Sequence, residues 1–436
     1  MMPIELIGIL FMVAMIGLIV VGIPIAFSMM IVGTIGMIVM GSTLQAQAQL
    51  ILNFWGTGTS FVLTAIPLYI LMGQLVYRTR IAADLYEAVY KWLGWLPGGL
   101  AITSVVACAG FGAVSGGSAT AVATLGPMCM PEMRRYNYSN RLAAGSIASA
   151  GTLGILIPPS VFLVVYGVWT ETSIGHLFIA GIIPGILMTL AFAGMILVRC
   201  LMWPELGPRG PHFPWGERFR SLSKVLPVFV VFMIIIGGIY GGVFDPSEAA
   251  AIGVSAIVVI ALIMRRLDLT SMKEALLGTM HTSAMLYLIV TGGHMLGHFV
   301  VLTKLTEGIV DWMSALELAP LAMIALFSVM YVLLGMVLDV WAMLILTIPF
   351  LFPVILLIGL DPVWFGIYVI VMSELALITP PIGVNVYVMA KVAPDVPLGE
   401  IFKGVAPFFI SVLLIVVLIS VFPQIVLWLP SLAFAR

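Results

Sequence analysis

Runs of about 20 apolar residues recur along the chain, with short polar segments between them. One α-helix needs a run of this length to cross the hydrocarbon core of a bilayer, whereas the strands of a membrane β-barrel alternate apolar and polar side chains. Hydrophobic residues make up 62% of the chain and charged residues 8%, which is more apolar surface than a soluble core can bury. The sequence therefore predicts an all-α polytopic membrane protein with spans at 4–21, 23–40, 54–77, 142–174, 176–199, 225–243, 247–264, 275–300, 363–391 and 405–430.

The basic residues give these spans an orientation. Sixteen of the 18 Lys and Arg residues fall in five loops, and only Lys304 and Arg436 lie outside them. Cytoplasmic loops carry an excess of Lys and Arg, so all five loops are expected on the cytoplasmic side. Counting the spans outward from these loops places both chain termini on the opposite face.

Two further apolar segments, 97–133 and 318–360, are interrupted by glycines and polar residues. The first lies between basic loops and the second between acidic ones, so each is expected to enter and leave the membrane on one side. We predict an inner re-entrant hairpin with its tip near Ser115–Ser118, and an outer one with its tip near Gly335–Asp339. Two complete spans joined by an ordinary loop remain an alternative for each segment, because both arrangements give the same topology.

The chain carries an internal repeat at an offset of 222 residues. At this offset six prolines fall on other prolines, where composition alone predicts about one. The matched pairs are Pro24 and Pro246, Pro127 and Pro349, Pro131 and Pro353, Pro158 and Pro380, Pro159 and Pro381, and Pro208 and Pro430. We therefore predict two halves, 1–210 and 222–436, each with about five spans and one hairpin. Since the hairpins open to opposite faces, the halves would form an inverted repeat, an architecture of many secondary transporters.

Two amphipathic segments, 80–96 and 301–317, also match each other: "LYEAVYKW" in the first aligns with "LTEGIVDW" in the second. Both carry tryptophans, and such segments lie along the membrane interface. We expect them to form interfacial arm helices. Simple loops with aromatic anchors remain an alternative.

The stretch "GAVSGGSATAVATLG" at 112–126 contains the tip of the first hairpin. A helix that stops at membrane depth leaves carbonyls and amides unpaired, so such a tip must face protein, water or an ion. Half-helix carbonyls and hydroxyls together suit a hard monovalent cation such as Na⁺, while half-helix N-termini suit an anion. Close helix packing through the GxxxG formed by Gly112 and Gly116 is the alternative.

A proline pair interrupts one apolar span in each half. Pro158-Pro159 and Pro380-Pro381 remove backbone N–H donors and free carbonyls one turn back, so each pair is expected to unwind its helix. A simple kink is the alternative at each place. Paired with the two hairpins, the breaks predict two symmetry-related Na⁺ sites. The first would use Ser115, Gly116, Ser118, Thr152, Gly154 and Pro158, and the second Gly335, Asp339, Thr379, Pro380 and Asn385.

Three carboxylates stand out in apolar surroundings. Asp339 falls on Gly117 at the repeat offset, and a carboxylate at a hairpin tip is costly unless it serves a site. Its alternatives are an N-cap for a helix over 340–358 or an externally exposed charge. Glu374 lies inside a span, where a buried hydrogen-bonded or protonated side chain is as good an interpretation as a functional one. Glu248 follows "DPS" and fits the first turn of a helix, which favours acidic residues.

Other chemistries find little support in the sequence. His294 and His298 are four residues apart, but no Cys or carboxylate completes a zinc set. The three cysteines show neither disulfide nor zinc spacing. No GxxxxGK[ST] motif is present, so there is no sign of an ATP-hydrolysing loop, and no convergent His, Asp and Glu set points to an enzyme.

Four motifs in order resemble the large membrane subunit of tripartite ATP-independent periplasmic (TRAP) transporters: "GFGAVSGGSATAVATLGPMCMPEM", "GTLGILIPPS", "GGVFDPSEAAA" and "ELALITPPIGVNVYV". The resemblance implies a Na⁺-coupled importer of a small organic acid, often a C4-dicarboxylate or sialic acid, in the bacterial cytoplasmic membrane with both termini periplasmic. The symmetry of the hairpins and breaks predicts two Na⁺ ions, and no organic cofactor is expected. The family resemblance also implies a small four-helix membrane subunit and a periplasmic binding protein as partners. Because the chain opens on the first large-subunit helix, the small subunit is expected to be a separate protein.

The resemblance also implies an elevator, in which a transport domain moves against a scaffold. By the same resemblance, Ser115, Gly116 and Ser118 match the inner hairpin tip and Asp339 the outer one. The expected scaffold is 1–79 and 211–300, with arm helices at 80–96 and 301–317, and the expected transport domain is 97–210 and 318–436. Residues expected next to the substrate are Ser115, Thr120, Ser160, Asp339 and Asn385. An uncoupled channel or facilitator with re-entrant hairpins is the alternative.

Overall fold

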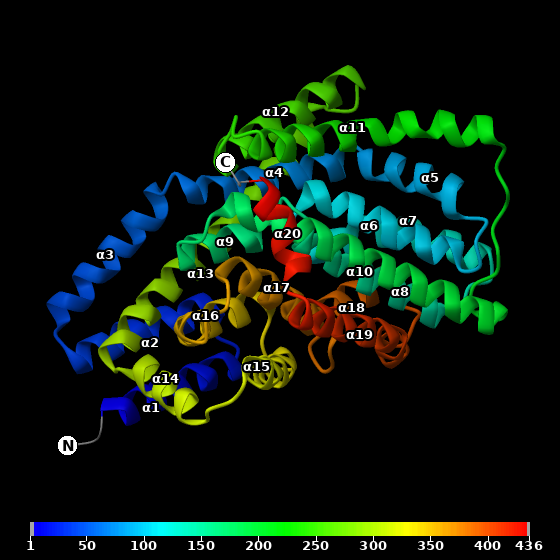
Figure 1. Cartoon of the computed structure of the whole chain (residues 1–436). Helices are drawn as coiled ribbons and strands as arrows, with labels where there is room; N and C mark the ends of the chain where they lie inside the picture. The colour runs from blue at the N-terminus through cyan, green and yellow to red at the C-terminus, as the bar shows by residue number, and fades with distance from the viewer. Residues whose placement is uncertain (1–3, 434–436) are drawn as a thin grey trace.

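The computed structural model describes residues 4–433, which form 20 α-helices and two 3₁₀ turns and contain no strand (Figure 1). The all-α prediction is confirmed. The first half contains α1 (Ile4–Val20), α2 (Ile25–Met40), α3 (Thr43–Thr59), α4 (Ala65–Arg78), α5 (Ile81–Leu93), α6 (Gly99–Ser115), α7 (Ser118–Arg135), α8 (Asn140–Leu156), α9 (Val161–Thr170) and α10 (Ile174–Met202), with 3₁₀ turns at Val62–Thr64 and Pro204–Leu206. The second half contains α11 (Trp215–Tyr240), α12 (Pro246–Ile263), α13 (Leu269–Leu302), α14 (Leu305–Ala315), α15 (Pro320–Gly335), α16 (Val340–Leu357), α17 (Pro362–Ile378), α18 (Val384–Val392), α19 (Leu398–Val421) and α20 (Gln424–Ala433).

Several of these helices are long and apolar enough to cross a membrane. Within residues 4–433 there are six such helices, or up to eight if each of two bent helix pairs counts as one span. One bent pair is α8 with α9, which meet at an angle of 41° at the first proline pair. The second proline pair likewise separates α17 from α18. Length and composition therefore support a polytopic membrane protein.

Helix ends follow local sequence signals. Asp245 accepts hydrogen bonds from the backbone N–H groups of Ser247 and Glu248, and the Glu248 side chain accepts one from the Asp245 backbone N–H, so the two form a capping box at the start of α12. Glu248 thus lies in the first turn of a helix. Asp361 caps α17 in a similar way, ahead of Pro362 at the first helical position.

The helix bounds repeat at the offset seen in the sequence. α7 and α16 both begin and end 222 residues apart, and so do α8 and α17. The offset therefore describes helices as well as prolines. The inversion of the two halves relative to a membrane remains a prediction.

Two further predicted spans are broken in the structure. The span at 54–77 is wrong as a single helix: α3 ends at Thr59, and the segment Val62–Arg78 continues at an angle of 59°. The run Gly56 to Ser60 holds weak helix formers, and Pro67 suits the first turn of a new helix, where its missing N–H has no acceptor to lose. The span at 405–430 is also divided, because Pro423 separates α19 from α20.

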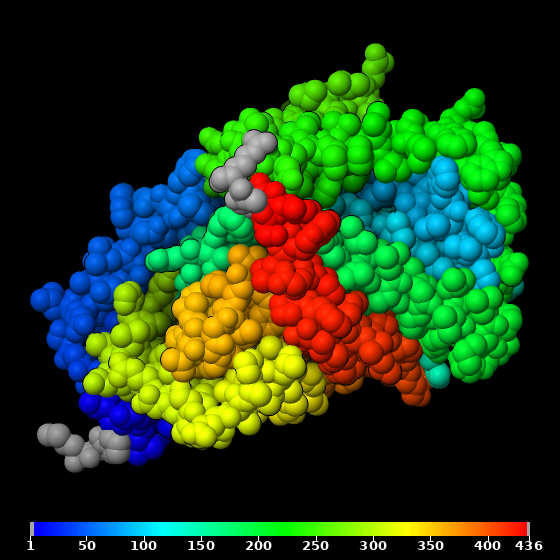
Figure 2. Space-filling model, viewed as in Figure 1, coloured from blue at the N-terminus to red at the C-terminus, as the bar shows by residue number. Residues whose placement is uncertain are grey.

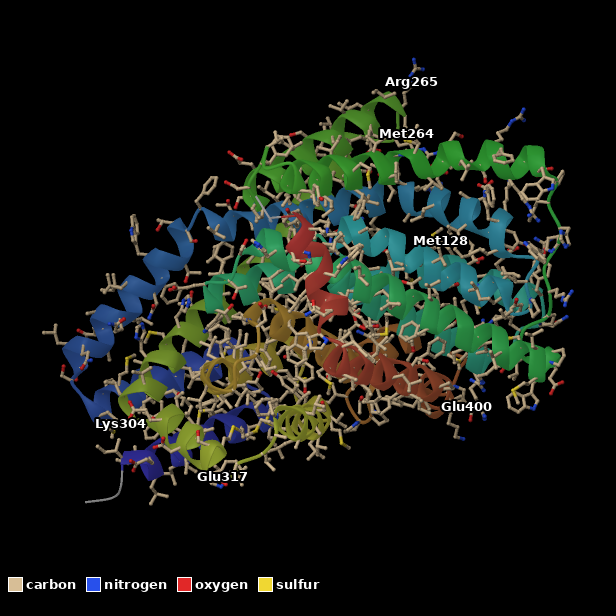
Figure 3. The ribbon with its side chains drawn as sticks, viewed as in Figure 1. Met128, Met264, Arg265, Lys304, Glu317 and Glu400 are labelled. Atoms are coloured by element: carbon tan, nitrogen blue, oxygen red, sulfur yellow. The ribbon has the colours of Figure 1, made fainter. Side chains whose placement is uncertain are left out.

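Figure 1 shows how the helices are arranged. α2, α3, α13 and α14 lie together toward one end, while α5, α6, α7, α8 and α10 run side by side toward the other. In the space-filling view, α20 lies on the surface against α10 (Figure 2). Lys304 and Glu317, both expected on the non-cytoplasmic side, lie near the α14 end, and Glu400 lies toward the opposite end (Figure 3).

Candidate functional site

The first hairpin turns over two glycines. α6 ends at Ser115 and α7 begins at Ser118. Gly116 has a φ of +60°, a left-handed conformation that side chains other than glycine rarely adopt. A Cβ on Gly116 would also lie 2.9 Å from the carbonyl oxygen of Pro159, so the tip packs directly on the backbone of the α8–α9 break.

Further glycines bring this hairpin and the broken helix together. A Cβ on Gly112 would lie 2.8 Å from the Cα of Gly154, and a Cβ on Gly154 would lie 2.9 Å from the carbonyl oxygen of Gly117. The structure thus brings three members of the first predicted Na⁺ set, Gly116, Gly154 and the Pro158 break, into one backbone-to-backbone contact. Such a contact places the carbonyl oxygens of Gly117 and Pro159 between the hairpin and the broken helix.

Asn385 connects the first hairpin to the second half. Its side chain is fully buried, and its amide Nδ2 donates to Ser118 Oγ at 2.7 Å and to the carbonyl oxygen of Ala148 at 2.9 Å. Ser118 Oγ in turn lies 2.9 Å from Asn385 Oδ1. The sequence assigned Asn385 to the second Na⁺ set, whereas the structure places it beside the first hairpin.

The hydroxyls of Thr152 and Ser160 have partners away from the hairpin tip. Thr152 Oγ1 donates to the carbonyl oxygen of Ser149 at 2.8 Å and lies 3.3 Å from Glu374 Oε2. Ser160 Oγ donates to the carbonyl oxygen of Ile155 at 2.5 Å, within the α8–α9 break. Both side chains are fully buried.

The second hairpin turns between Gly335 and Asp339. Asp339 Oδ1 accepts the backbone N–H of Ala342 at 2.8 Å, so Asp339 is the N-cap of α16. A Cβ on Gly335 would lie 3.0 Å from the Cβ of Ala376, which brings α15 close to α17. In the facing break, Thr379 Oγ1 donates to the carbonyl oxygen of Leu375 one turn back, ahead of Pro380.

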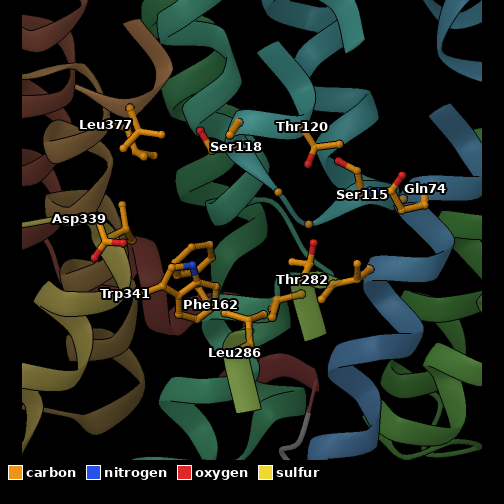
Figure 4. A pocket seen from close by; sticks show the side chains of 18 residues that line it. Gln74, Ser115, Ser118, Thr120, Phe162, Thr282, Leu286, Asp339, Trp341 and Leu377 are labelled. Carbon is orange, nitrogen blue, oxygen red and sulfur yellow. The ribbon is translucent and has the colours of Figure 1, made fainter. Parts of the chain in front are cut away.

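The two hairpin tips line one cavity of about 210 Å³ (Figure 4). Five predicted site residues lie on its wall: Ser115, Gly116, Ser118, Thr120 and Asp339. The remaining predicted residues lie outside that wall: Thr152, Gly154, Pro158, Ser160, Gly335, Thr379, Pro380 and Asn385. The cavity therefore joins the two tips directly, and residues next to both proline breaks, Val161 and Leu377 among them, also line it.

A family profile described as "Tripartite ATP-independent periplasmic transporter, DctM component" matches residues 12–425. The chain belongs to the DctM family of TRAP transporters. This permease is therefore a transporter component and not an enzyme. Its relatives are likewise named as transporter permeases.

Relatives of this TRAP permease match over most of their length. It is 33% identical to the C4-dicarboxylate TRAP transporter large permease protein of Pseudomonas aeruginosa, over 88% of this chain and 89% of the relative. It is 33% identical to the sialic acid TRAP transporter large permease protein of Vibrio cholerae, over 95% of this chain and 96% of the relative. It is 32% identical to the ectoine/5-hydroxyectoine TRAP transporter large permease protein of Ruegeria pomeroyi, over 86% of this chain and 87% of the relative.

A solved structure shares the fold of this TRAP permease. The YdaH transporter of Alcanivorax borkumensis superposes with a TM-score of 0.60 at 15% identity, covering 88% of this chain and 89% of that one. At this identity the likeness concerns the fold alone.

Four cavity residues of the TRAP permease carried no strong signal in its sequence. Gln74 of α4 and Thr282 of α13 add polar groups to the wall, and Phe162 and Trp341 stack with ring centroids 3.8 Å apart and planes 18° apart. Phe162 follows the first proline break and Trp341 follows Asp339 at the second hairpin tip. Their position in the chain next to these interruptions was the one sequence signal that could have placed them at the cavity. Gln74 and Thr282 could be recognised only as polar residues within apolar helices.

The cavity of the TRAP permease carries a single ionisable side chain. Of its lining residues only Asp339 is acidic, and none is Lys, Arg or His. Among residues 4–433 no group of three or more His, Cys, Asp or Glu side chains is placed to hold a metal ion. Cation binding at these tips would therefore depend on carbonyl and hydroxyl oxygens, with Asp339 as the one carboxylate on the cavity wall.

Proposed function

We propose that this permease imports a small organic acid, such as a C4-dicarboxylate, sialic acid or a similar carboxylate, by Na⁺-coupled secondary active transport. The observation that carries the proposal is the meeting of the two hairpin tips, Ser115–Ser118 and Asp339, at one cavity, each tip backed by a broken helix. Paired interrupted helices of this kind supply half-helix ends for a coupling cation and an anionic substrate.

Two Na⁺ ions would bind at the two tips. The first site has the buried contact of Gly116 with the carbonyl oxygen of Pro159, and the unpartnered hydroxyl of Ser115 lies at the same tip. The second has the carboxylate of Asp339. One Na⁺ moving down 100 mV releases about 2.3 kcal/mol, so two ions could concentrate a substrate substantially.

Polar contacts support a division into a scaffold and a moving transport domain. The pairs Arg134–Asp395 (2.5 Å) and Arg141–Glu400 (2.6 Å) lie within the proposed transport domain. The pairs of the scaffold and its first arm are Arg78–Glu274, Lys91–Glu217, Lys224–Glu87 and Arg266–Asp84. With His176 left aside, the described residues make no ion pair or side-chain hydrogen bond between 1–79 or 211–300 and the transport domain. The first arm makes one, from Tyr90 OH to Tyr136 OH at 3.2 Å.

Glycines contribute to the contact between the two proposed units, together with ring contacts such as Tyr69 with Phe178. A Cβ on Gly73 of α4 would lie 2.8 Å from the Cα of Ser115, and a Cβ on Gly293 of α13 would lie 2.0 Å from the Trp169 ring. An interface without ion pairs or side-chain hydrogen bonds between the described residues of the scaffold spans and the transport domain suits an elevator movement of one unit along the other. A channel does not need such an interface.

The proposed assembly includes two partners. A small four-helix membrane subunit would bind the scaffold, and a periplasmic binding protein would deliver the substrate. One relative, the isethionate TRAP transporter permease protein of Oleidesulfovibrio alaskensis, is matched over 92% of this chain but 63% of its own length. The proposed location is the bacterial cytoplasmic membrane, with both termini periplasmic.

The test is uptake into proteoliposomes that contain the permease, the small subunit and a substrate-loaded binding protein. Asp339→Ala and the double variant Ser115→Ala/Ser118→Ala should abolish Na⁺-dependent uptake while expression is kept. Ser255→Ala, an exposed position on α12, is the matched control and should transport normally. Normal Na⁺-dependent uptake by both site variants would refute the site assignment. Flux that neither saturates nor requires Na⁺ would instead favour the channel.

A further inference from the structure

The two hairpins differ at one equivalent position. α7 and α16 begin 222 residues apart, so Gly117 and Asp339 are the N-caps of corresponding helices. On α16 the Asp339 carboxylate accepts the backbone N–H of Ala342 at 2.8 Å. The second hairpin thus already holds a carboxylate at its helix N-terminus.

The first hairpin leaves the same place empty of any side chain. Gly117 is the N-cap of α7 and has no side chain that could accept a hydrogen bond. The first backbone N–H of α7 that donates within the helix is that of Ala121, which lies 3.3 Å from the carbonyl oxygen of Gly117. The three amides before it have no acceptor within the helix and lie on the partly positive end of the helix dipole. Their residues, Ser118 to Thr120, line the cavity.

A buried hydroxyl stands beside these amides without a partner. Ser115 is 6% exposed, its Oγ makes no hydrogen bond, and it lines the cavity next to Thr120 (Figure 4). A buried donor without an acceptor is costly unless a ligand supplies one. Free amides, a helix N-terminus and a free hydroxyl together form a site for an anion.

We propose that the N-terminus of α7, with Ser115, binds the carboxylate of a substrate that carries a single negative charge. The ligand carboxylate takes on α7 the place that the Asp339 carboxylate takes on α16. This inference rests on the proposed function and narrows its substrate class.

The rest of the cavity selects against a second negative charge. Asp339 lies across the cavity from Ser115 and Gln74 in Figure 4, and no lining residue is basic. The Phe162–Trp341 stack forms an apolar wall between the two sides. A dicarboxylate held by one end at α7 would turn its other end toward this wall or toward Asp339, whose charge a bound Na⁺ neutralises without leaving a positive side chain to hold a second carboxylate. A neutral or cationic end is accommodated there.

The test measures binding of four probes to the full-length permease in nanodiscs with Na⁺, by calorimetry. N-acetylneuraminate, isethionate and ectoine each carry one anionic group, and succinate carries two. We expect at least one single-anion probe to bind ten-fold or more tightly than succinate. Succinate binding as tightly as the best of the other three would overturn the inference and leave the proposed function standing. Failure of all four probes to bind would contradict both.

A substitution tests the position of the site. Gly117 has extended backbone angles (φ −137°, ψ 130°), so Gly117→Asp places a capping carboxylate on α7 without backbone strain. Its Cβ would lie 3.3 Å from Thr120 Oγ1, a side-chain atom that has to shift only slightly. It should lower the affinity for the bound probe at least 30-fold and leave the melting temperature unchanged or higher. Gly216→Asp, the same substitution in the first turn of α11 with open space around it, should bind as the wild type does. If Gly117→Asp does not fold, Gly117→Asn, which places an uncharged cap on α7, should still lower the affinity for the probe about ten-fold. Wild-type affinity in the folded Gly117 variant would disprove the site.

Discussion

The hydroxyl of Thr152 on α8 lies 3.3 Å from a carboxylate oxygen of Glu374 on α17, and the two residues stand 222 positions apart. Each residue therefore contacts its own counterpart in the predicted repeat. In an assembly of two equivalent units related by a two-fold axis, residues meet their counterparts only near that axis. This contact marks where the axis between the two halves would pass.

The first prediction concerns the charge of Glu374. The carboxyl group is fully buried, and its Oε1 has no hydrogen-bond partner. The hydroxyl of Thr152 donates its one hydrogen to the carbonyl oxygen of Ser149 and so does not donate to Glu374. A buried unpaired charge is costly, so Glu374→Gln should melt at or above the wild-type temperature. Glu374→Ala should lose about 2–4 kcal/mol through the cavity it leaves. Thermal melting in detergent measures both, and a large loss in the Gln variant would show that the charge itself stabilises the fold.

The second prediction concerns the junction between the halves. Asn385→Ala leaves Ser118 Oγ and the carbonyl oxygen of Ala148 buried without their partner, and should cost about 2–3 kcal/mol. Ser118→Ala in the Asn385→Ala background should cost less than it does alone, because the two side chains act together. A double-mutant cycle by thermal melting gives the coupling, expected at about 1–2 kcal/mol. Additive losses would mean that the contact does not hold the junction.

The third prediction separates two roles of Asp339. Asn caps a helix about as well as Asp, so Asp339→Asn should keep the melting temperature, whereas Asp339→Ala should lose about 1 kcal/mol. If the negative charge binds Na⁺, both variants should lose at least ten-fold in Na⁺-dependent uptake. Full uptake by the Asn variant would leave Asp339 as a cap alone.

The fourth prediction concerns the contact between the proposed units. A Cβ on Gly293 would lie 2.0 Å from the Trp169 ring, so Gly293→Ala should destabilise the chain by about 1–3 kcal/mol through overpacking. Gly297, one turn further along α13, has nothing within 4 Å of such a Cβ. Gly297→Ala is therefore the matched control and should melt as the wild type does. Melting curves and uptake rates for the pair check the prediction, and equal behaviour would contradict it.

The fifth prediction concerns pH. The hydrogen bond from Arg134 lowers the pKa of Asp395 below its ordinary value of 3.8. Since the folded-state pKa is the lower one, the stabilisation is complete above the unfolded-state pKa and disappears as pH falls through the folded-state value. Asp395→Asn should thus melt slightly below wild type at pH 7, and the difference should disappear as the pH falls through the lowered pKa of Asp395. A difference that persists in acid would exclude the ion pair as its source.

Local signals predicted the helix breaks well. Glycines at 116 and 117 and the two proline pairs act through their own backbones, so the sequence alone indicates where helices stop. The bend between α3 and α4 was missed because an apolar run reads as continuous even where weak helix formers and Pro67 divide it.

Contacts between distant segments were beyond the reach of the sequence. Asn385 was assigned to the second hairpin by nearness in the chain, but tertiary packing brings it to Ser118 of the first. Gln74 and Thr282 reach the cavity only because α4 and α13 pack beside the hairpins. The membership of the two Na⁺ sets and the domain division remain predictions.

The confinement of ion pairs to one proposed unit or the other has a kinetic consequence. If the two units move past each other, no charged side chain of these ion pairs has to separate from its partner. The energy barrier would then arise from repacking side chains such as Trp169 and from the surrounding lipid. Turnover should respond steeply to temperature and bilayer thickness, and hardly at all to ionic strength.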